Sequence, residues 1–278
     1  MRLGDYNRLR VSRAVDFGLY LDGGEAGDIL LPTRYVPKGT QIGDELTVFL
    51  YLDQEERLIA TTDTPLCRVG DFAYLEVAWV NKYGAFLKWG LMKDLFCPFR
   101  EQKRRMEQGQ SYIVHVHLDE ESYRIVASAK VEHYFDPSPA PYVSGDEVDL
   151  LIWQKTELGF KVIVDNRWPG LVYENQVFQD IQTGDRMKGY ILQVRQDGKI
   201  DIALQPTGFQ KTEDFARQLY HYLLAHDGYT PLGDKSDAEE IKREFQVSKK
   251  TFKRAVGQLY KQQIFTIAPD GIRLTEGE

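Results

Sequence analysis

Tyr83-Gly84-Ala85-Phe86-Leu87 is the stretch that decides the fold, because its pattern occurs in three copies along the chain. Residues 17–21 (FGLYL) and 158–162 (LGFKV) are the other two copies. From the glycine of each copy, an apolar residue follows after 12 positions, a second glycine after 25 and an isoleucine after 41. These positions are Leu30, Phe96 and Leu171, then Gly43, Gly109 and Gly184, then Ile59, Ile125 and Ile200. Four coincident positions in three copies, the glycine and the three that follow it, indicate a repeated structural unit.

The second copy is the clearest guide to what this unit is. Its apolar residues alternate with polar ones, which is typical of half-buried strands and not of helices. Residues 72–80 form the first predicted strand, with Ala73, Leu75, Val77 and Trp79 expected on the core face. After a turn, the alternation directs Ala85, Leu87 and Trp89 inward and leaves Phe86 on the solvent side. Five short strands, with a longer insertion between the third and fourth, predict an OB-type barrel.

The end of the chain has a different period. Phe215, Leu219, Tyr222 and Leu223 mark a first helix, residues 236–245 a second, and a third is expected from Ser248 to about residue 263. A hairpin over residues 264–274 completes a winged helix-turn-helix. The predicted fold class is therefore mainly β with a C-terminal α+β domain: three tandem OB-fold, S1-like, five-stranded barrels plus the winged helix. The expected domains are 1–65, 66–134, 142–207 and 208–278, with a proline-rich linker before the third barrel.

Composition and charge narrow the class of protein. The 278 residues carry a net charge of −7, which argues against a protein that coats nucleic acid indiscriminately. Residues 1–65 are acidic, whereas residues 66–134 have a slight excess of cations, so a polyanion site should be local. No apolar run is long enough to span a membrane and no signal peptide is evident, which predicts a cytoplasmic location. Cys67 and Cys97 are expected to be inert thiols.

The repeated stretch also resembles a known domain. Tyr83-Gly84-Ala85-Phe86-Leu87, residues 95–98 (LFCP) and Gly109-Gln110 are similar to the RNA-binding domain first described in ribosomal protein S1. Three such copies followed by a winged helix resemble the conserved virulence factor B family of bacterial proteins. This resemblance implies a cytoplasmic, non-enzymatic RNA-binding protein linked to gene regulation.

Aromatic faces that stack on bases, beside cations that track phosphates, hold single-stranded nucleic acid. The second copy offers Phe86 with Lys82, Tyr83 and Lys88, although Phe86 could instead cover a contact between domains. The first copy has Tyr20 in the register of Phe86, but acidic residues surround it. In the third copy only Tyr173 occupies the position where the family pattern has a binding histidine.

Cations elsewhere could extend the phosphate track. Arg100 and Lys103 lie in the insertion of the second copy, where the alternative is a solvated helix face. Arg124 and Lys199 lie at the last strands of the second and third copies. In the winged helix, the candidate residues are Lys249, Lys250, Lys253 and Arg254 on the third helix and Arg273 on the wing. The alternative for the third helix is again a solvated face.

Three functional hypotheses remain open on the sequence alone. The first is a regulator that binds single-stranded RNA, and the second is a transcriptional regulator that reads duplex DNA with the winged helix. The third is a scaffold that docks ribosomal or RNA-processing proteins. His115 and His117 have no third ligand near them in sequence, so we expect a surface pair and no metal site. No catalytic motif and no cofactor site are predicted, and the oligomeric state stays open.

Overall fold

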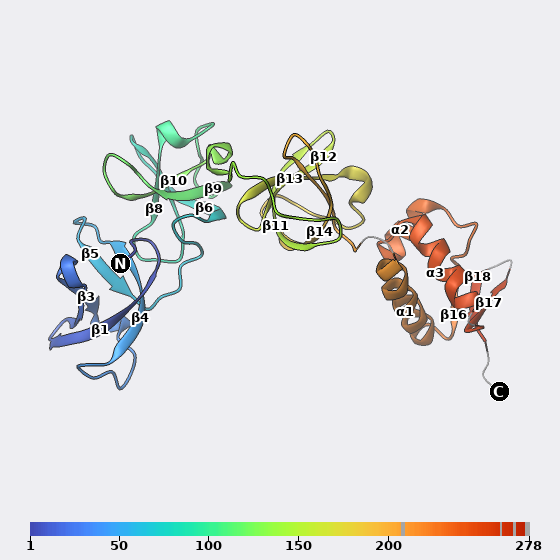
Figure 1. Ribbon diagram of the computed structural model, residues 1–278, viewed down its shortest axis with the longest axis horizontal. Helices are drawn as coiled ribbons and strands as arrows, with labels where there is room; N and C mark the ends of the chain where they lie inside the picture. The colour runs from blue at the N-terminus through green and yellow to red at the C-terminus, as the bar shows by residue number, and fades with distance from the viewer. Residues whose placement is uncertain (207–208, 262, 269–270, 276–278) are drawn as a thin grey trace. The chain divides into compact units, whose positions relative to one another are not determined.

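The computed structural model describes residues 1–206, 209–261, 263–268 and 271–275, and within them three closed barrels precede a helical domain (Figure 1). The chain divides into two compact units, residues 1–136 and 137–278. The predicted fold class is confirmed. The strands of the first barrel are β1 (Tyr6–Val15), β2 (Gly18–Asp22), β3 (Asp28–Pro32), β4 (Glu45–Leu52) and β5 (Leu58–Thr61), in the order β1-β2-β3-β5-β4.

The other two barrels repeat this plan. The second contains β6 (Phe72–Val80), β7 (Gly84–Leu87), β8 (Leu95–Pro98), β9 (Ser111–Leu118) and β10 (Ile125–Ser128). The third contains β11 (Glu147–Thr156), β12 (Gly159–Val164), β13 (Trp168–Tyr173), β14 (Arg186–Val194) and β15 (Ile200–Ala203). In each barrel the third strand pairs with the fifth in parallel, which closes the cylinder.

The first repeated glycine opens the second strand because no side chain fits there. A Cβ atom on Gly18, Gly84 or Gly159 would collide with a backbone carbonyl oxygen of the adjacent third strand. Gly18 and Gly159 also have φ values of +155° and +135°, which L-residues rarely adopt. The close approach of two backbones therefore explains this part of the repeat.

The second repeated glycine secures a β-bulge in the first strand. The register of the first strand against the second shifts at Val11/Arg13, Val77/Trp79 and Ile152/Gln154. In each barrel the residue just before the shift forms two backbone hydrogen bonds with the second repeated glycine and the residue after it. In the second barrel these bonds are Gly109 N to Val77 O and Val77 N to Gln110 O, both at 2.9 Å. Gly43, Gly109 and Gly184 all have positive φ. The bulge is thus a regular structural feature of all three copies of the repeat.

This bulge overturns the expected position of Trp79. Strict alternation placed Trp79 in the core, but the extra residue in β6 reverses the parity and leaves its side chain 42% exposed. Trp89, which lies beyond β7, is buried as expected. The side chains of Cys67 and Cys97 are buried, and burial raises the pKa of the Cys97 thiol to about 12.

Within residues 1–136 the two barrels share a hydrophobic core. Phe49 and Tyr51 from β4 pack into the cluster that contains the interior of the second barrel, and the Phe49 and Trp89 rings meet edge-on at 5.9 Å. Gly4, which precedes β1, donates a hydrogen bond from its N–H to Leu50 O, and it accepts one from the N–H of Val69 in the connection between the barrels. These contacts make the first two barrels one packed unit.

The C-terminal domain has the order of a winged helix. Its elements are α1 (Phe209–Ala225), β16 (Tyr229–Thr230), α2 (Ala238–Phe245), α3 (Lys249–Lys261), β17 (Phe265–Ala268) and β18 (Gly271–Leu274), with sheet order β16-β18-β17. Asp237 caps α2 by accepting a hydrogen bond from Glu239 N. Phe252, Ala255, Val256 and Leu259 bury one face of α3. Among the described residues, no helix has the length and apolar character needed to cross a membrane.

Candidate nucleic-acid interface

An aromatic ladder crosses the outward face of the second barrel. The bulge turns the Trp79 ring outward, where it stacks on Phe86 with centroids 3.6 Å apart and planes within 5°. Phe86 in turn lies 4.9 Å from Phe96, its partner across β7 and β8. Three rings from three adjacent strands therefore form one continuous apolar surface, which we call the aromatic ladder.

Phe86 itself differs from its expected setting. The alternation of side chains along the strand predicts that the Phe86 ring faces water. The ring does point away from the barrel core, but its two aromatic neighbours leave it half-buried. Trp79 holds its own orientation by donating a hydrogen bond from Nε1 to Asp94 Oδ2 at 2.9 Å. Large rings locked in this way lose little entropy when a ligand stacks on them.

Tyr83 and Lys82 extend the ladder at the β6–β7 turn. The Tyr83 ring is 62% exposed, and Lys82 Nζ lies 5.0 Å from its centroid. Among the described residues Lys82 forms no ion pair, so its charge is available to a phosphate. Lys88, also predicted for this face, is neutralised by Glu76 with Nζ–Oε1 at 2.6 Å.

The remaining predicted cations of the second barrel also have acidic partners. Arg100 pairs with Asp119 and Glu121, and Lys103 pairs with Glu132. Arg124 Nε lies 2.9 Å from Glu56 Oε2 of the first barrel. The hydroxyl of Ser122, which donates to Asp119, together with Arg100 holds the pKa of the Asp119 carboxyl below its usual range.

Three local expectations for this barrel are corrected. The basic insertion is not a helix: apart from the 3-10 turn η3 (Phe99–Glu101), residues 100–110 are irregular, and buried Met106 anchors them. Arg124 lies just before β10 rather than within it. His115 is buried, not superficial, because its ring packs between Phe72 and Tyr134, and burial lowers its pKa to about 4.

The same positions in the other barrels carry no such ladder. In the first barrel the row is Arg13, Tyr20 and Leu30, and the Arg13 guanidinium lies 4.1 Å from the centroid of Tyr20. In the third barrel the row is Gln154, Lys161 and Leu171. Only the second barrel, among the described residues, combines three aromatic rings in contact on this face.

The predicted residues of the third barrel are engaged internally. Arg195 covers the half-buried Tyr173 ring and donates to its hydroxyl. Arg195 Nη2 also lies 2.8 Å from Oδ1 of buried Asp201, and this hydrogen-bonded pair raises the pKa of Arg195. Lys199 pairs with Asp197 at 3.0 Å. Tyr173 would have to leave this network to stack freely on a base.

The winged helix presents its cations on the outer face of α3. Lys250, Lys253 and Arg254 are exposed, and Lys249 is half-buried at the first turn. Lys253 Nζ lies 3.1 Å from Asp234 Oδ1, in the loop before α2. Arg273 of the wing covers the Tyr229 ring at 4.4 Å. Four predicted cations are thus grouped along one helix, and Arg273 contacts a neighbouring strand.

Two residues of the candidate interface escaped the sequence reasoning. Trp79 was assigned to the core, although the aligned copies place Arg13 and Gln154 at the same distance before the repeated glycine. Polar residues at that position are the signal that the site faces outward. Glu56 was not among the predicted site residues, because its contact with another barrel leaves no trace in the sequence. Among the described residues, no cluster of three or more His, Cys, Asp or Glu side chains could hold a metal.

Comparisons with known proteins agree with this architecture. Residues 3–63 match an S1 domain model and residues 217–274 match a CvfB-like winged helix domain model; both are domain types that bind nucleic acid. The uncharacterized protein YitL of Bacillus subtilis is 26% identical over 278 residues, which cover 94% of this chain and 90% of YitL. Conserved virulence factor B of Staphylococcus aureus is 24% identical over 243 residues, covering 85% and 81%.

A solved structure of a multidomain protein with nucleic acid binding domains from Streptococcus pneumoniae matches with a TM-score of 0.46 and 20% identity, over 98% of both chains. The relatives and the two domain models together confirm the resemblance to the conserved virulence factor B family.

Proposed function

We propose that this chain, which resembles the conserved virulence factor B family, is a non-enzymatic protein that binds single-stranded RNA in the cytoplasm and acts in gene regulation. The observation that carries this proposal is the aromatic ladder of Trp79, Phe86 and Phe96. Stacking on an aromatic ring stabilises an unpaired base by about 1–3 kcal/mol and requires the base to be outside a duplex.

The charge distribution supports a single strand over a duplex at this surface. Most cations of the second barrel are paired with carboxylates, so the face offers few free charges for the dense phosphates of a duplex. Lys82 and Tyr83, at the edge of the ladder, provide one cation and one further ring. This arrangement favours a ligand held mainly by its bases.

The test is a set of binding titrations with single-stranded RNA, duplex RNA and duplex DNA at low and high salt. We expect single-stranded RNA to bind most tightly and Phe86→Ala to weaken it about tenfold, because the alanine removes the central ring of the ladder. Tyr74→Ala is the matched control, since Tyr74 lies on β6 with 41% exposure but outside the ladder. Equal affinity of Phe86→Ala and wild type, with the fold intact by thermal melting, would remove the ladder from the binding site.

A second candidate function is binding of duplex DNA through α3, and the exposed face of Lys250, Lys253 and Arg254 favours it. Lysine contributes phosphate contacts more readily than base-edge contacts, so this face alone argues for weak sequence preference. Charge reversal at Lys250 and Lys253 separates the candidates. If duplex DNA binding disappears while RNA binding persists, α3 serves DNA; if neither ligand binds wild type, a role in docking ribosomal or RNA-processing proteins is favoured.

A further inference from the structure

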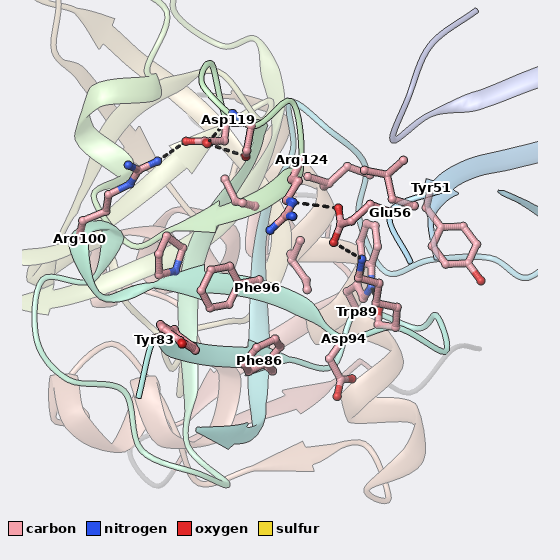
Figure 2. Close-up of a pocket in the computed structure, with 17 residues that line it drawn as sticks. Tyr51, Glu56, Tyr83, Phe86, Trp89, Asp94, Phe96, Arg100, Asp119 and Arg124 are labelled. Atoms are coloured by element: carbon pink, nitrogen blue, oxygen red, sulfur yellow. Dashed lines mark hydrogen bonds and ion pairs between the residues drawn. The ribbon is translucent and has the colours of Figure 1, made fainter. Parts of the chain in front are cut away.

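A pocket of about 590 Å³ opens where the first barrel meets the end of the aromatic ladder (Figure 2). This volume lies within the range of small-molecule sites. The first barrel contributes Tyr51, Leu52 and Glu56, and the second contributes Phe86 and Phe96 among others. The pocket is therefore shared by two domains that are packed together through a common core.

The chemistry of the pocket fits an aromatic base. Phe96 lies in its centre, with Phe86 and Tyr83 on one side and Arg124 on the other (Figure 2). Leu52, Leu95, Ile125 and Val126 make further parts of the wall apolar. The charged lining residues are three cations and three carboxylates, so the pocket interior carries no net charge: Lys93, Arg100 and Arg124 against Glu56, Asp94 and Asp119. A neutral ring system is a better occupant than a bare anion.

Glu56 connects the two barrels at this junction. It lies in the β4–β5 hairpin with φ of +64°, a conformation that costs a side-chain-bearing residue energy. The residue two positions before the last strand has a positive φ in all three barrels, since Tyr123 has +56° in the second and Gly198 has +78° in the third. From this turn the Glu56 carboxylate reaches the second barrel, where it lies 2.9 Å from Arg124 Nε and 3.3 Å from Lys93 Nζ.

We propose that this pocket receives one nucleotide of the bound strand, with its base against Phe96, and that Glu56 competes with the phosphate of that nucleotide for Arg124 and Lys93. This inference rests on the proposed binding of single-stranded RNA. The acidic first barrel thereby restrains the affinity of the second. A strand that enters the pocket fully exchanges the carboxylate for its phosphate, whereas a ligand without an unpaired base leaves the Glu56 pairs in place.

The first test removes the competing charge. Glu56→Gln keeps the shape of the side chain and should bind a fluorescein-labelled oligouridylate about two- to fivefold more tightly than wild type, the range expected from releasing exposed ion pairs. Its salt dependence should also be steeper, because a freed cation adds a phosphate contact. Glu55→Gln is the matched control: Glu55 lies in the same hairpin but pairs only with Arg57 of its own barrel at 3.1 Å among the described residues, so its affinity should equal that of wild type.

The second test fills the pocket from the first barrel. Leu52→Trp should weaken oligouridylate binding at least about fivefold by excluding the base, while Leu66→Trp, at a 66% exposed position outside the pocket, should leave it unchanged. If Glu56→Gln behaves like Glu55→Gln, or Leu52→Trp binds like wild type, the shared pocket is refuted although Phe86→Ala still weakens binding. If wild type binds no single strand, both this inference and the proposed function fail.

Discussion

Replacing Trp79 by alanine should weaken single-stranded RNA binding about tenfold. A base stacked on an aromatic ring contributes about 1–3 kcal/mol. One face of the Trp79 indole is already covered by Phe86, with 3.6 Å between centroids, so only the other face is open to a base. The lower part of that range, about 1.4 kcal/mol, corresponds to a tenfold change in the dissociation constant. The substitution also removes the hydrogen bond from the indole to Asp94, which fixes the orientation of the Trp79 ring.

Intrinsic fluorescence provides the assay. The chain has four tryptophans, and Trp89 and Trp168 are only 3% and 5% exposed. Quenching by a bound oligouridylate should therefore come mainly from Trp79, with Trp153 as the other accessible indole. In Trp79→Ala we expect most of this quenching to disappear, and fluorescence anisotropy of a labelled strand should report the weaker affinity independently.

Two results would refute this reasoning. One is a folded Trp79→Ala variant that keeps both its affinity and its quenching, because then the open face of the indole does not meet a base. The other is an equal loss in Tyr74→Ala, a residue of the same strand with nearly the same exposure, 41% against 42%. Equal losses would mean that any exposed ring on β6 contributes, and that the ladder has no special role.

Two predictions concern stability. Gly159→Ala should lower the free energy of unfolding by about 3 kcal/mol in urea titrations, because its Cβ would collide with Val172 O at a φ of +135°. Gly198→Ala, with open space around it, should lower the free energy of unfolding by only about 1 kcal/mol. Equal losses in the two variants would contradict the close-approach argument. Burial lowers the pKa of His115 to about 4, below its value of about 6.5 in an unfolded chain, so the unfolded state binds the proton first and stability should fall as pH drops between these values. His115→Phe should lose less stability than wild type over that window, and an unchanged pH slope would exclude His115 as the cause.

The architecture could be predicted from the sequence because the repeated residues are those that the backbone geometry of each barrel requires. The glycine at each second strand is required by a close approach to the third strand, and the later glycine by the turn that bonds the bulge. Such constraints recur in every copy whatever the copy does. The helical period and the Ser248 position likewise located α3, whose first residue is Lys249.

The binding surface was only partly predictable, for two physical reasons. A bulge changes the parity of every residue after it, and a single copy gives no sign of the extra residue, so Trp79 was assigned to the wrong side. Contacts between domains depend on the packing of whole barrels, so the reach of Glu56 to Arg124 could not be read from local patterns. Most predicted cations are paired with carboxylates, and these ion pairs could not be predicted for the same reason.

The three barrels therefore have one scaffold but different outward faces. The same row of cross-strand positions holds Arg13, Tyr20 and Leu30 in the first barrel, the three rings of the aromatic ladder in the second, and Gln154, Lys161 and Leu171 in the third. Had all three barrels bound consecutive bases alike, each row would need an open aromatic platform. The first barrel instead directs a carboxylate toward the second, and the third engages Tyr173 in an internal network. We infer a division of labour in which the second barrel stacks bases and the first sets how easily a strand can reach it.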